Sequence, residues 1–246
     1  VPVDTIEPQG IVTLTTDANG FYHATGLIPG SYRVVETTQP SGFYDGLDRA
    51  GTVGGTPVGS AVNPGDKIEG IFLGGGASGV DYNFGELAPA SIRGSVHLTD
   101  RDGNCFTPAS LDRPLQGVTI RLLDAQNQLV TETLTNAQGE YEFTNLRPGL
   151  YSVVEVTPAQ LIDGEEHIGT INGVSVGNVG ANDVLAGILL SSAANAIHYD
   201  FCEHESANVS GFVYHDANEN AVFFFSEIAC GEQTCWHTLR VWSWPG

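Results

Sequence analysis

The sequence predicts an all-β protein that is built from tandem repeats and contains almost no helix. One observation is a duplication: Thr16–Glu36 and Thr135–Glu155 are near copies, and each reads as turn, strand, Pro-Gly turn and strand. The other is composition, because 31 Gly, 12 Pro, no Met and 15% charged residues suit short strands joined by turns. No amphipathic helical window is evident along the chain.

Each copy carries the residues that its turns and strands require. Gly20 and Gly139 supply the unrestricted backbone of a tight turn. Pro29-Gly30 and Pro148-Gly149 supply a second turn, and Tyr32–Glu36 alternates as a pleated strand does. We therefore expect the same two turns and strands in both copies.

The similarity between the copies extends over a whole unit. Aligned positions outside the duplicated stretch are Asp45 with Asp163, Gly51 with Gly169, Asp66 with Asp183, and Tyr82–Phe84 with Tyr199–Phe201. The offset between the copies changes little, so insertions are confined to loops, as in an array of modules.

New units open at Ser91–His97 and Asn208–Tyr214, which divides the chain into three parts. Residues 1–88 are an incomplete first repeat that lacks its opening strand, and 89–205 are a complete repeat. Residues 206–246 open a third repeat and end in a divergent tail rich in aromatic residues and cysteine. The two partial repeats are complementary, so we expect the third to complete the sheet of the first, within the chain or between copies by strand complementation. A cut through a longer array explains the same pattern.

The net charge limits which partners the chain can bind, and the cysteine content indicates the compartment in which it works. With 29 acidic and 9 basic residues the net charge is −20, which repels nucleic acid and anionic lipid and attracts divalent cations. No apolar run long enough to span a membrane is present. Four cysteines in an acidic β-protein favour an oxidising compartment, so we expect export, with any targeting signal or wall anchor in a longer parent protein.

Several motifs together resemble a known family. Gly211–Asn220, Thr16–Tyr22, Leu27–Glu36 and Tyr82–Glu86 are similar to the B-type repeats of bacterial serine-aspartate surface adhesins, which belong with the collagen-adhesin B-type, prealbumin-like domains. The resemblance implies tandem antiparallel Greek-key β-sandwiches of prealbumin or Ig-like type, strung as a stalk on exported proteins and stiffened by calcium. Many relatives also carry an internal Lys–Asn isopeptide bond. The only lysine here, Lys67, lies late in its unit, so we expect that bond to be absent.

Two loops have the spacing of calcium ligands. A twelve-residue loop places side-chain oxygens, one backbone carbonyl and a final bidentate carboxylate at Asp216, Asn218, Asn220, Val222 and Glu227. Ala221 replaces the usual glycine of that loop, which should weaken binding. A looser version at the equivalent place of the second repeat offers Asp100, Asp102, Asn104 and Asp112. Ordinary Asx-turn loops would have the same composition.

One segment offers nitrogen, sulfur and oxygen ligands. His198, Asp200, Cys202 and His204 alternate, so they would share one face of a strand and could hold zinc. The first repeat has no such set at the aligned positions, and a solvated strand face with a cysteine bonded elsewhere is the alternative.

Cysteines and tryptophans outside the repeat pattern suggest further roles. Cys105 with Cys202, and Cys230 with Cys235, are candidate disulfides, although sequence leaves both the connectivity and reduced thiols open. Trp236, Trp242 and Trp244 could stack on a carbohydrate, or complete the core of the first repeat.

Ser175 lies in Gly173–Gly177, which matches the Gly-x-Ser-x-Gly pattern of serine hydrolases. The aligned Gly55–Gly59 of the first repeat keeps the glycines without the serine, so we assign them to a turn of the repeat.

The sequence favours a non-catalytic, calcium-stiffened structural or adhesive module of an exported bacterial surface or matrix protein. Its partners would be neighbouring repeats, another copy of the chain, or an extracellular protein or glycan. Two alternatives are a zinc-assisted hydrolase using His198 and His204, and a carbohydrate-binding module using the tryptophans. Any activity beyond spacing and stiffness is expected among the unrepeated residues.

Overall fold

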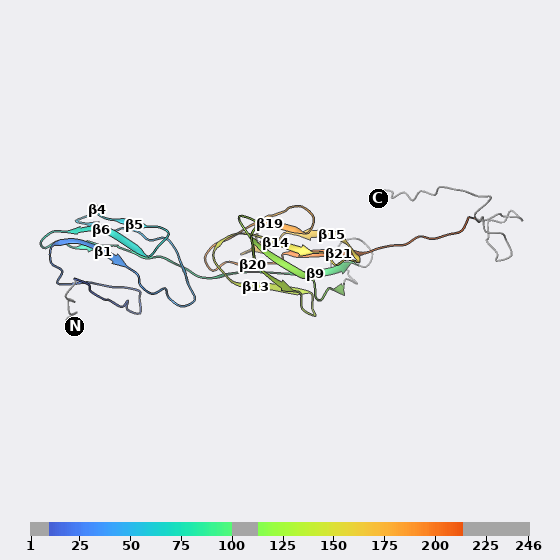
Figure 1. Cartoon of the computed structure of the whole chain (residues 1–246), viewed down its shortest axis with the longest axis horizontal. Coiled ribbons are helices and arrows are strands. Elements are labelled where there is room, and N and C mark those ends of the chain that lie inside the picture. The colour runs from blue at the N-terminus through green and yellow to red at the C-terminus, as the bar shows by residue number, and fades with distance from the viewer. Residues whose placement is uncertain (1–9, 100–112, 214–246) are drawn as a thin grey trace, which may run out of the picture. The chain divides into compact units, whose positions relative to one another are not determined.

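The structure is a computed structural model that describes residues 10–99 and 113–213. Within these ranges the chain forms twenty-one strands and no helix, which confirms the predicted all-β class (Figure 1). The described residues contain no helix of the length and apolarity needed to cross a membrane. Contacts along the chain group it into two compact units, Val1–His204 and Glu205–Gly246, and the described strands lie in the first except for the last residue of β21, Glu205.

The first repeat forms three small sheets. Their orders are β1-β6-β5, β4-β3-β7 and β2-β8. The strands are β1 (Gly30–Val35), β2 (Tyr44–Asp45), β3 (Thr52–Val53), β4 (Thr56–Pro57), β5 (Ser60–Val62), β6 (Lys67–Leu73), β7 (Gly79–Val80) and β8 (Glu86–Leu87). Ile68 and Ile71 of β6 form a small core with Tyr82, and partly buried apolar residues pack against it.

The second repeat is a sandwich of two sheets. The first, which we call the β9 sheet, has the order β15-β21-β9-β20-β16-β17, and β10 and β13 also pair with β9. Its strands are β9 (Ala90–Thr99), β10 (Arg113–Pro114), β13 (Glu140–Leu146), β15 (Leu161–His167), β16 (Thr170–Ile171), β17 (Val174–Ser175), β20 (Asn195–Ile197) and β21 (Asp200–Glu205).

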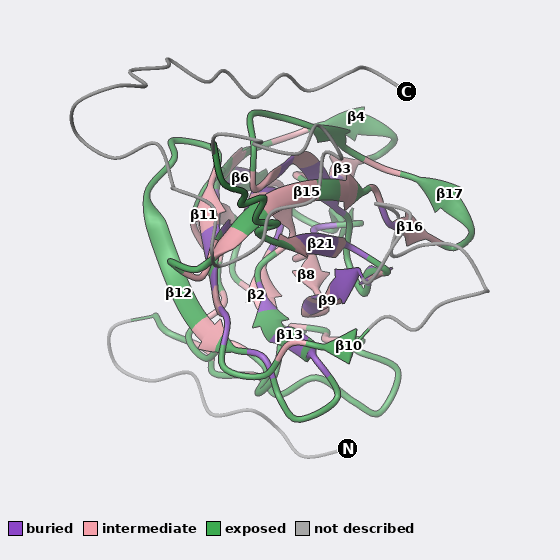
Figure 2. Cartoon of the chain, turned by 90° about the vertical axis from the view of Figure 1, so that its right-hand side faces the viewer, coloured by how far each residue is buried: buried purple, intermediate pink, exposed green. Residues whose placement is uncertain are grey.

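The other sheet of the second repeat, which we call the β14 sheet, has the order β12-β11-β14-β19-β18. Its strands are β11 (Thr119–Asp124), β12 (Leu129–Leu134), β14 (Gly149–Val156), β18 (Asn178–Val179) and β19 (Val184–Leu190). Alternate residues of both sheets form one core, in which Ile92, Ile120, Val153 and Ile188 are fully buried. Figure 2 shows buried stretches in β9 and β21, as expected for strands in the middle of a packed sheet.

Antiparallel pairs occur both in hairpins, such as β16 with β17, and between strands far apart in the sequence, such as β14 with β19, but two pairings with β9 are parallel. β20 and β21 both run parallel to β9, with Ala196 opposite Ile92 and Phe201 opposite Val96. The last strands of the repeat thus lie beside its first strand, and a break separates β20 from β21. Gly94 faces that break, where a Cβ atom would lie 1.8 Å from the carbonyl oxygen of Tyr199.

The two repeats share specific contacts as well as sequence. The Tyr151 hydroxyl donates to the carbonyl of Arg147 over 2.7 Å, and Tyr32 makes the same contact with Ile28. Likewise the backbone N–H of Glu155 donates to the backbone carbonyl of Asp183, and that of Glu36 donates to the backbone carbonyl of Asp66, both over 3.0 Å. The expected tight turns are present too, because Gly20 and Gly139 have φ values of 76° and 73°. These equivalences confirm the alignment of the copies.

Candidate metal centre: a buried carboxylate cluster

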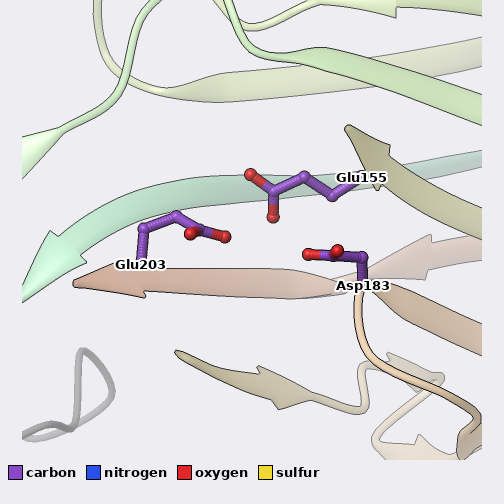
Figure 3. Close-up of side chains that lie close together, drawn as sticks. All are labelled: Glu155, Asp183 and Glu203. Atoms are coloured by element: carbon purple, nitrogen blue, oxygen red, sulfur yellow. The ribbon is translucent and has the colours of Figure 1, made fainter. Parts of the chain in front are cut away.

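Three carboxylates converge between the two sheets of the second repeat. Glu155 comes from β14 and Asp183 from the residue before β19, so both belong to the β14 sheet. Glu203 comes from β21 in the β9 sheet. Their carboxyl groups point toward one another in Figure 3, and each offers an oxygen within 4.8 Å of the others.

Strand periodicity explains why two of these side chains point inward. Tyr151, Val153 and Glu155 are the buried alternate residues of β14, so the glutamate occupies a core position. Phe201 and Glu203 stand in the same relation on β21, and both are buried. The sequence thus places acid where the pattern calls for an apolar residue.

The two glutamates of this group are closed to solvent and have no hydrogen-bond donor beside them. Glu155 is 3% exposed and Glu203 is 1% exposed, and neither carboxylate accepts a hydrogen bond on either oxygen. Asp183 has one unpaired buried oxygen, and its Oδ2 accepts a 2.7 Å hydrogen bond from the Thr157 hydroxyl. Burying an ionised carboxylate without a partner costs several kcal/mol, so this arrangement calls for a proton or a cation.

A second group of carboxylates adjoins the first through Asp183. Asp163 and Glu166, both on β15, lie with Asp183 within the same 4.8 Å limit and are half-buried. The backbone N–H of Asp183 donates to Glu166 Oε1 over 2.7 Å. The five side chains, which we call the carboxylate cluster, therefore form one continuous group.

Burial and mutual repulsion perturb the acidity of the cluster. Burial, followed by the charges of Glu203 and Asp183, raises the pKa of Glu155 to about 9. Burial and the charges of Asp183 and Asp163 raise the pKa of Glu203 to about 7. The pKa of Asp163 is also raised, by burial first, while His204 opposes that rise. Without a cation, the cluster therefore keeps protons at neutral pH.

The first repeat carries a more open copy of the cluster. The aligned residues are all acidic: Glu36, Asp45, Asp48, Asp66 and Glu86. Burial and Glu86 raise the pKa of Glu36 to about 7, and burial also raises the pKa values of Asp48 and Asp66. Gln39 donates a hydrogen bond to Glu86, a contact that the aligned position of the second repeat does not make. Among the described residues, three carboxylates meet within 4.8 Å only in the second repeat.

A glycine beside the first aspartate of each cluster allows two strands to approach closely. A Cβ atom on Gly164 would lie 2.2 Å from the carbonyl oxygen of Cys202 in β21. One on Gly46 would lie 2.5 Å from the carbonyl oxygen of Gly85. Only glycine fits such spacing, so Gly164 brings Asp163 close to the strand that carries Glu203.

Most of the ligands predicted from sequence lie outside the described residues. This applies to both calcium loops, to Cys105, Cys230 and Cys235, and to all three tryptophans. Cys202 lies in β21 and is 1% exposed, and its pairing with Cys105 stays a prediction. The calcium loops likewise stay predictions.

The residues proposed for zinc lie on interrupted strands. His198 has a φ of 61° in the break between β20 and β21, so it does not continue the strand face of Asp200 and Cys202. Its Nδ1 is 3.9 Å from Asp200 Oδ2. The other carboxylate oxygen of Asp200, Oδ1, accepts hydrogen bonds from the backbone N–H and the hydroxyl of Ser95. Among the described residues, the groups that come close enough to share one ion are carboxylates, and this set is not among them.

Ser175 lies in a β-hairpin. β16 and β17 pair across Asn172 and Gly173, which have φ values of 52° and 78° and so form the tight turn. The hydrolase motif needs a turn from strand into helix, and no helix follows Ser175 in the described chain. Gly173 belongs to the hairpin turn, whereas Gly177 lies beyond β17, where a Cβ atom would lie 2.7 Å from the carbonyl oxygen of Ala186 in β19.

The carboxylate cluster was missed by sequence reasoning, although the repeat contained a signal for it. All five positions are acidic in both copies, while residues beside them differ, as at Thr37 and Val156, or at Gly85 and Cys202. Because the ligands are all carboxylate oxygens, the cluster suits a hard cation such as calcium better than zinc, which prefers nitrogen and sulfur.

The fold defines a protein built from prealbumin-like β-sandwich domains. Residues 90–201 match the model of the SdrD B-like domain, and residues 4–50 match a prealbumin-like fold domain. The second repeat is therefore an SdrD B-like domain, which confirms the resemblance seen in the motifs.

Known proteins are similar to this sequence over different lengths. Serine-aspartate repeat-containing protein D of Staphylococcus aureus (strain Newman) is 27% identical over 220 residues, 85% of this chain and 15% of that protein. Colossin-A of Dictyostelium discoideum is 34% identical over 163 residues, 61% of this chain and 1% of that protein. The chain thus spans about 15% of the length of the serine-aspartate repeat proteins that it matches. Its homology to these bacterial cell-surface proteins agrees with the expected secreted or surface location.

Among solved structures, GBS52, the minor pilin of Streptococcus agalactiae, matches with a TM-score of 0.33 and 14% identity. The match covers 61% of this chain and 60% of the pilin.

Proposed function

We propose that this chain is a non-catalytic structural and adhesive module of an exported surface or matrix protein, and that bound calcium stiffens it. The proposal depends on one observation above all: a domain that matches the SdrD B-like family holds the buried carboxylates of Glu155 and Glu203 between its sheets without a hydrogen-bond partner. Neighbouring repeats, or another copy of the chain through strand complementation, are the partners we expect.

A structural role is supported by how the described polar groups are used. Ser175 lies in a hairpin, and the Asp200 carboxylate accepts hydrogen bonds from Ser95. The exposed His198 stands in a strand break next to a surface hollow of about 500 Å³ that Arg93 and Tyr141 also line. The Ser95 hydroxyl donates directly to the Asp200 carboxylate, without the histidine that stands between serine and acid in a serine hydrolase.

The calcium part of the proposal is tested by thermal unfolding of the whole chain. A ligand that binds only the folded state stabilises it by about 2.7 kcal/mol at one hundred times its Kd. We expect the melting temperature to rise with calcium chloride, and to rise less with equal magnesium chloride, because magnesium demands a stricter octahedral site. A melting temperature that is the same with calcium and in metal-free buffer would contradict calcium stiffening.

A further inference from the structure

We infer that the carboxylate cluster of the second repeat binds one calcium ion between the two sheets, and that the first repeat holds a more open version of the same site. This inference rests on the calcium part of the proposed function and goes beyond it. It assigns calcium to the interior of the sandwich, apart from the loops at 100–112 and 216–227.

The carboxylate cluster differs from an ordinary acidic surface in its burial and in its lack of ion pairs. Glu155 and Glu203 are 3% and 1% exposed, and all four of their carboxylate oxygens are buried without a hydrogen-bond partner. None of the ion pairs between described residues involves a member of the cluster. The one lysine of the chain, Lys67, lies in the first repeat and pairs with Glu69 over 3.0 Å. His204 is the basic group that faces the cluster, next to Asp163.

The spacing and the chemistry of the carboxylate oxygens suit calcium. Calcium binds six to eight oxygens at about 2.3–2.6 Å, so ligand oxygens on opposite sides of the ion lie about 5 Å apart. In each of the two carboxylate triads, one oxygen from every residue lies within 4.8 Å of the others, and the triads share Asp183. The buried triad of Glu155, Asp183 and Glu203 can supply up to six oxygens if its carboxylates bind through both oxygens. The absence of nitrogen and sulfur from either triad favours calcium over a transition metal.

The acidic residues of the cluster recur at the aligned positions of both repeats. Glutamate or aspartate occupies all five positions in both repeats, and the only exchange is Asp48 for Glu166. Residues beside the cluster have diverged freely, since Leu47 aligns with Glu165 and Leu87 with His204. Acid is therefore kept where it is most costly to bury, which is expected if these carboxylates share a ligand.

Such an ion would join the two layers of the sandwich. Glu155 and Asp183 hold it from the β14 side, whereas Glu203 holds it from β21 of the β9 sheet, and Asp163 and Glu166 adjoin the site through Asp183. The ion replaces repulsion between these carboxylates with attractive contacts to both sheets. Sliding or separation of the sheets would then require those contacts to break, which stiffens the domain.

Calcium binding to the whole chain tests the assignment. Calorimetric titration with calcium chloride should give one fewer ion per chain in the double variant Glu155→Gln with Glu203→Gln than in the unmodified chain. The matched control is Glu142→Gln with Glu165→Gln, which removes the same charge from exposed positions on β13 and β15. We expect the control to keep the full number of sites.

A second variant protects the test against misfolding. Asp163→Asn with Glu166→Gln changes the half-buried carboxylates that adjoin the site through Asp183. We expect this variant to weaken the calcium affinity of the site about tenfold or more, because calcium affinity follows the negative charge of the site. If both variants bind as many ions as the unmodified chain with unchanged affinity, the cluster is not the site, even though the proposed function still stands. If the unmodified chain binds no calcium, both the assignment and the calcium part of the proposed function are wrong. Stabilisation by acid without any response to calcium would show shared protons, and would overturn the assignment.

Discussion

The charge state of the carboxylate cluster predicts a stability that falls with pH in the absence of calcium. In the folded chain the pKa of Glu155 is raised to about 9 and that of Glu203 to about 7, from ordinary values of 4.5. Between the ordinary and the raised pKa, the folded state holds a proton that the unfolded state has released. The stabilisation is therefore complete below pH 4.5, and it is lost as pH rises through about 7 and about 9.

The size of this effect follows from proton linkage. One proton bound only by the folded state changes the free energy of unfolding by about 1.4 kcal/mol per pH unit. Glu155 alone therefore predicts a loss of about 3 kcal/mol between pH 5 and pH 7. Glu203, and Glu36 in the first repeat, act in the same direction.

Urea unfolding followed by circular dichroism at pH 5, 6 and 7 measures the effect. In metal-free buffer the urea midpoint should fall as pH rises. In millimolar calcium it should rise or stay level, because calcium needs the ionised carboxylates and competes with their protons. The variant Glu155→Gln with Glu203→Gln should lose most of the slope in metal-free buffer. A midpoint that rises from pH 5 to pH 7 in that buffer, or a slope unchanged in the variant, would refute the reasoning.

Two further predictions concern packing around the cluster and in the core. Gly164→Ala should destabilise the chain by about 1–3 kcal/mol in urea unfolding, because its Cβ would collide with the carbonyl of Cys202; Gly149→Ala, with no atom nearer than 3.7 Å, should be tolerated. Ile188→Ala should cost about 2–5 kcal/mol, whereas its exposed neighbour Leu189→Ala should change stability little. Equal effects within either pair would contradict the packing described here.

Local sequence patterns were enough to predict the strands and turns of the repeats. Alternation at Tyr151–Glu155 and the positive φ of Gly139 are local properties, and both are present as expected. The parallel pairing of β21 with β9 could not be predicted this way. It joins residues more than one hundred positions apart, such as Val96 and Phe201, and no turn between them fixes their register.

The cluster shows a different limit of sequence reasoning. Its members come from β14, β15, β21 and the residue before β19, so no motif spacing links them. A contiguous calcium loop shows its ligand spacing in the sequence, whereas carboxylates that are brought together by the packing of two sheets do not. The alignment of the repeats contained the information, because it marks which acidic positions recur.

The expectation that activity lies among the unrepeated residues therefore needs to be weighed against the repeated carboxylates. Buried charges are weak contributors to stability, and apolar residues of similar size would often stabilise a core more. Two copies of the repeat nonetheless carry acid at the same five positions, two of which are core positions in the second copy. We infer that a module with this interior reaches its full stability at neutral pH only when a cation is supplied from outside. Extracellular modules bind calcium with Kd values of about 10⁻⁴–10⁻³ M, so the stiffness of the chain would follow the calcium concentration of its surroundings.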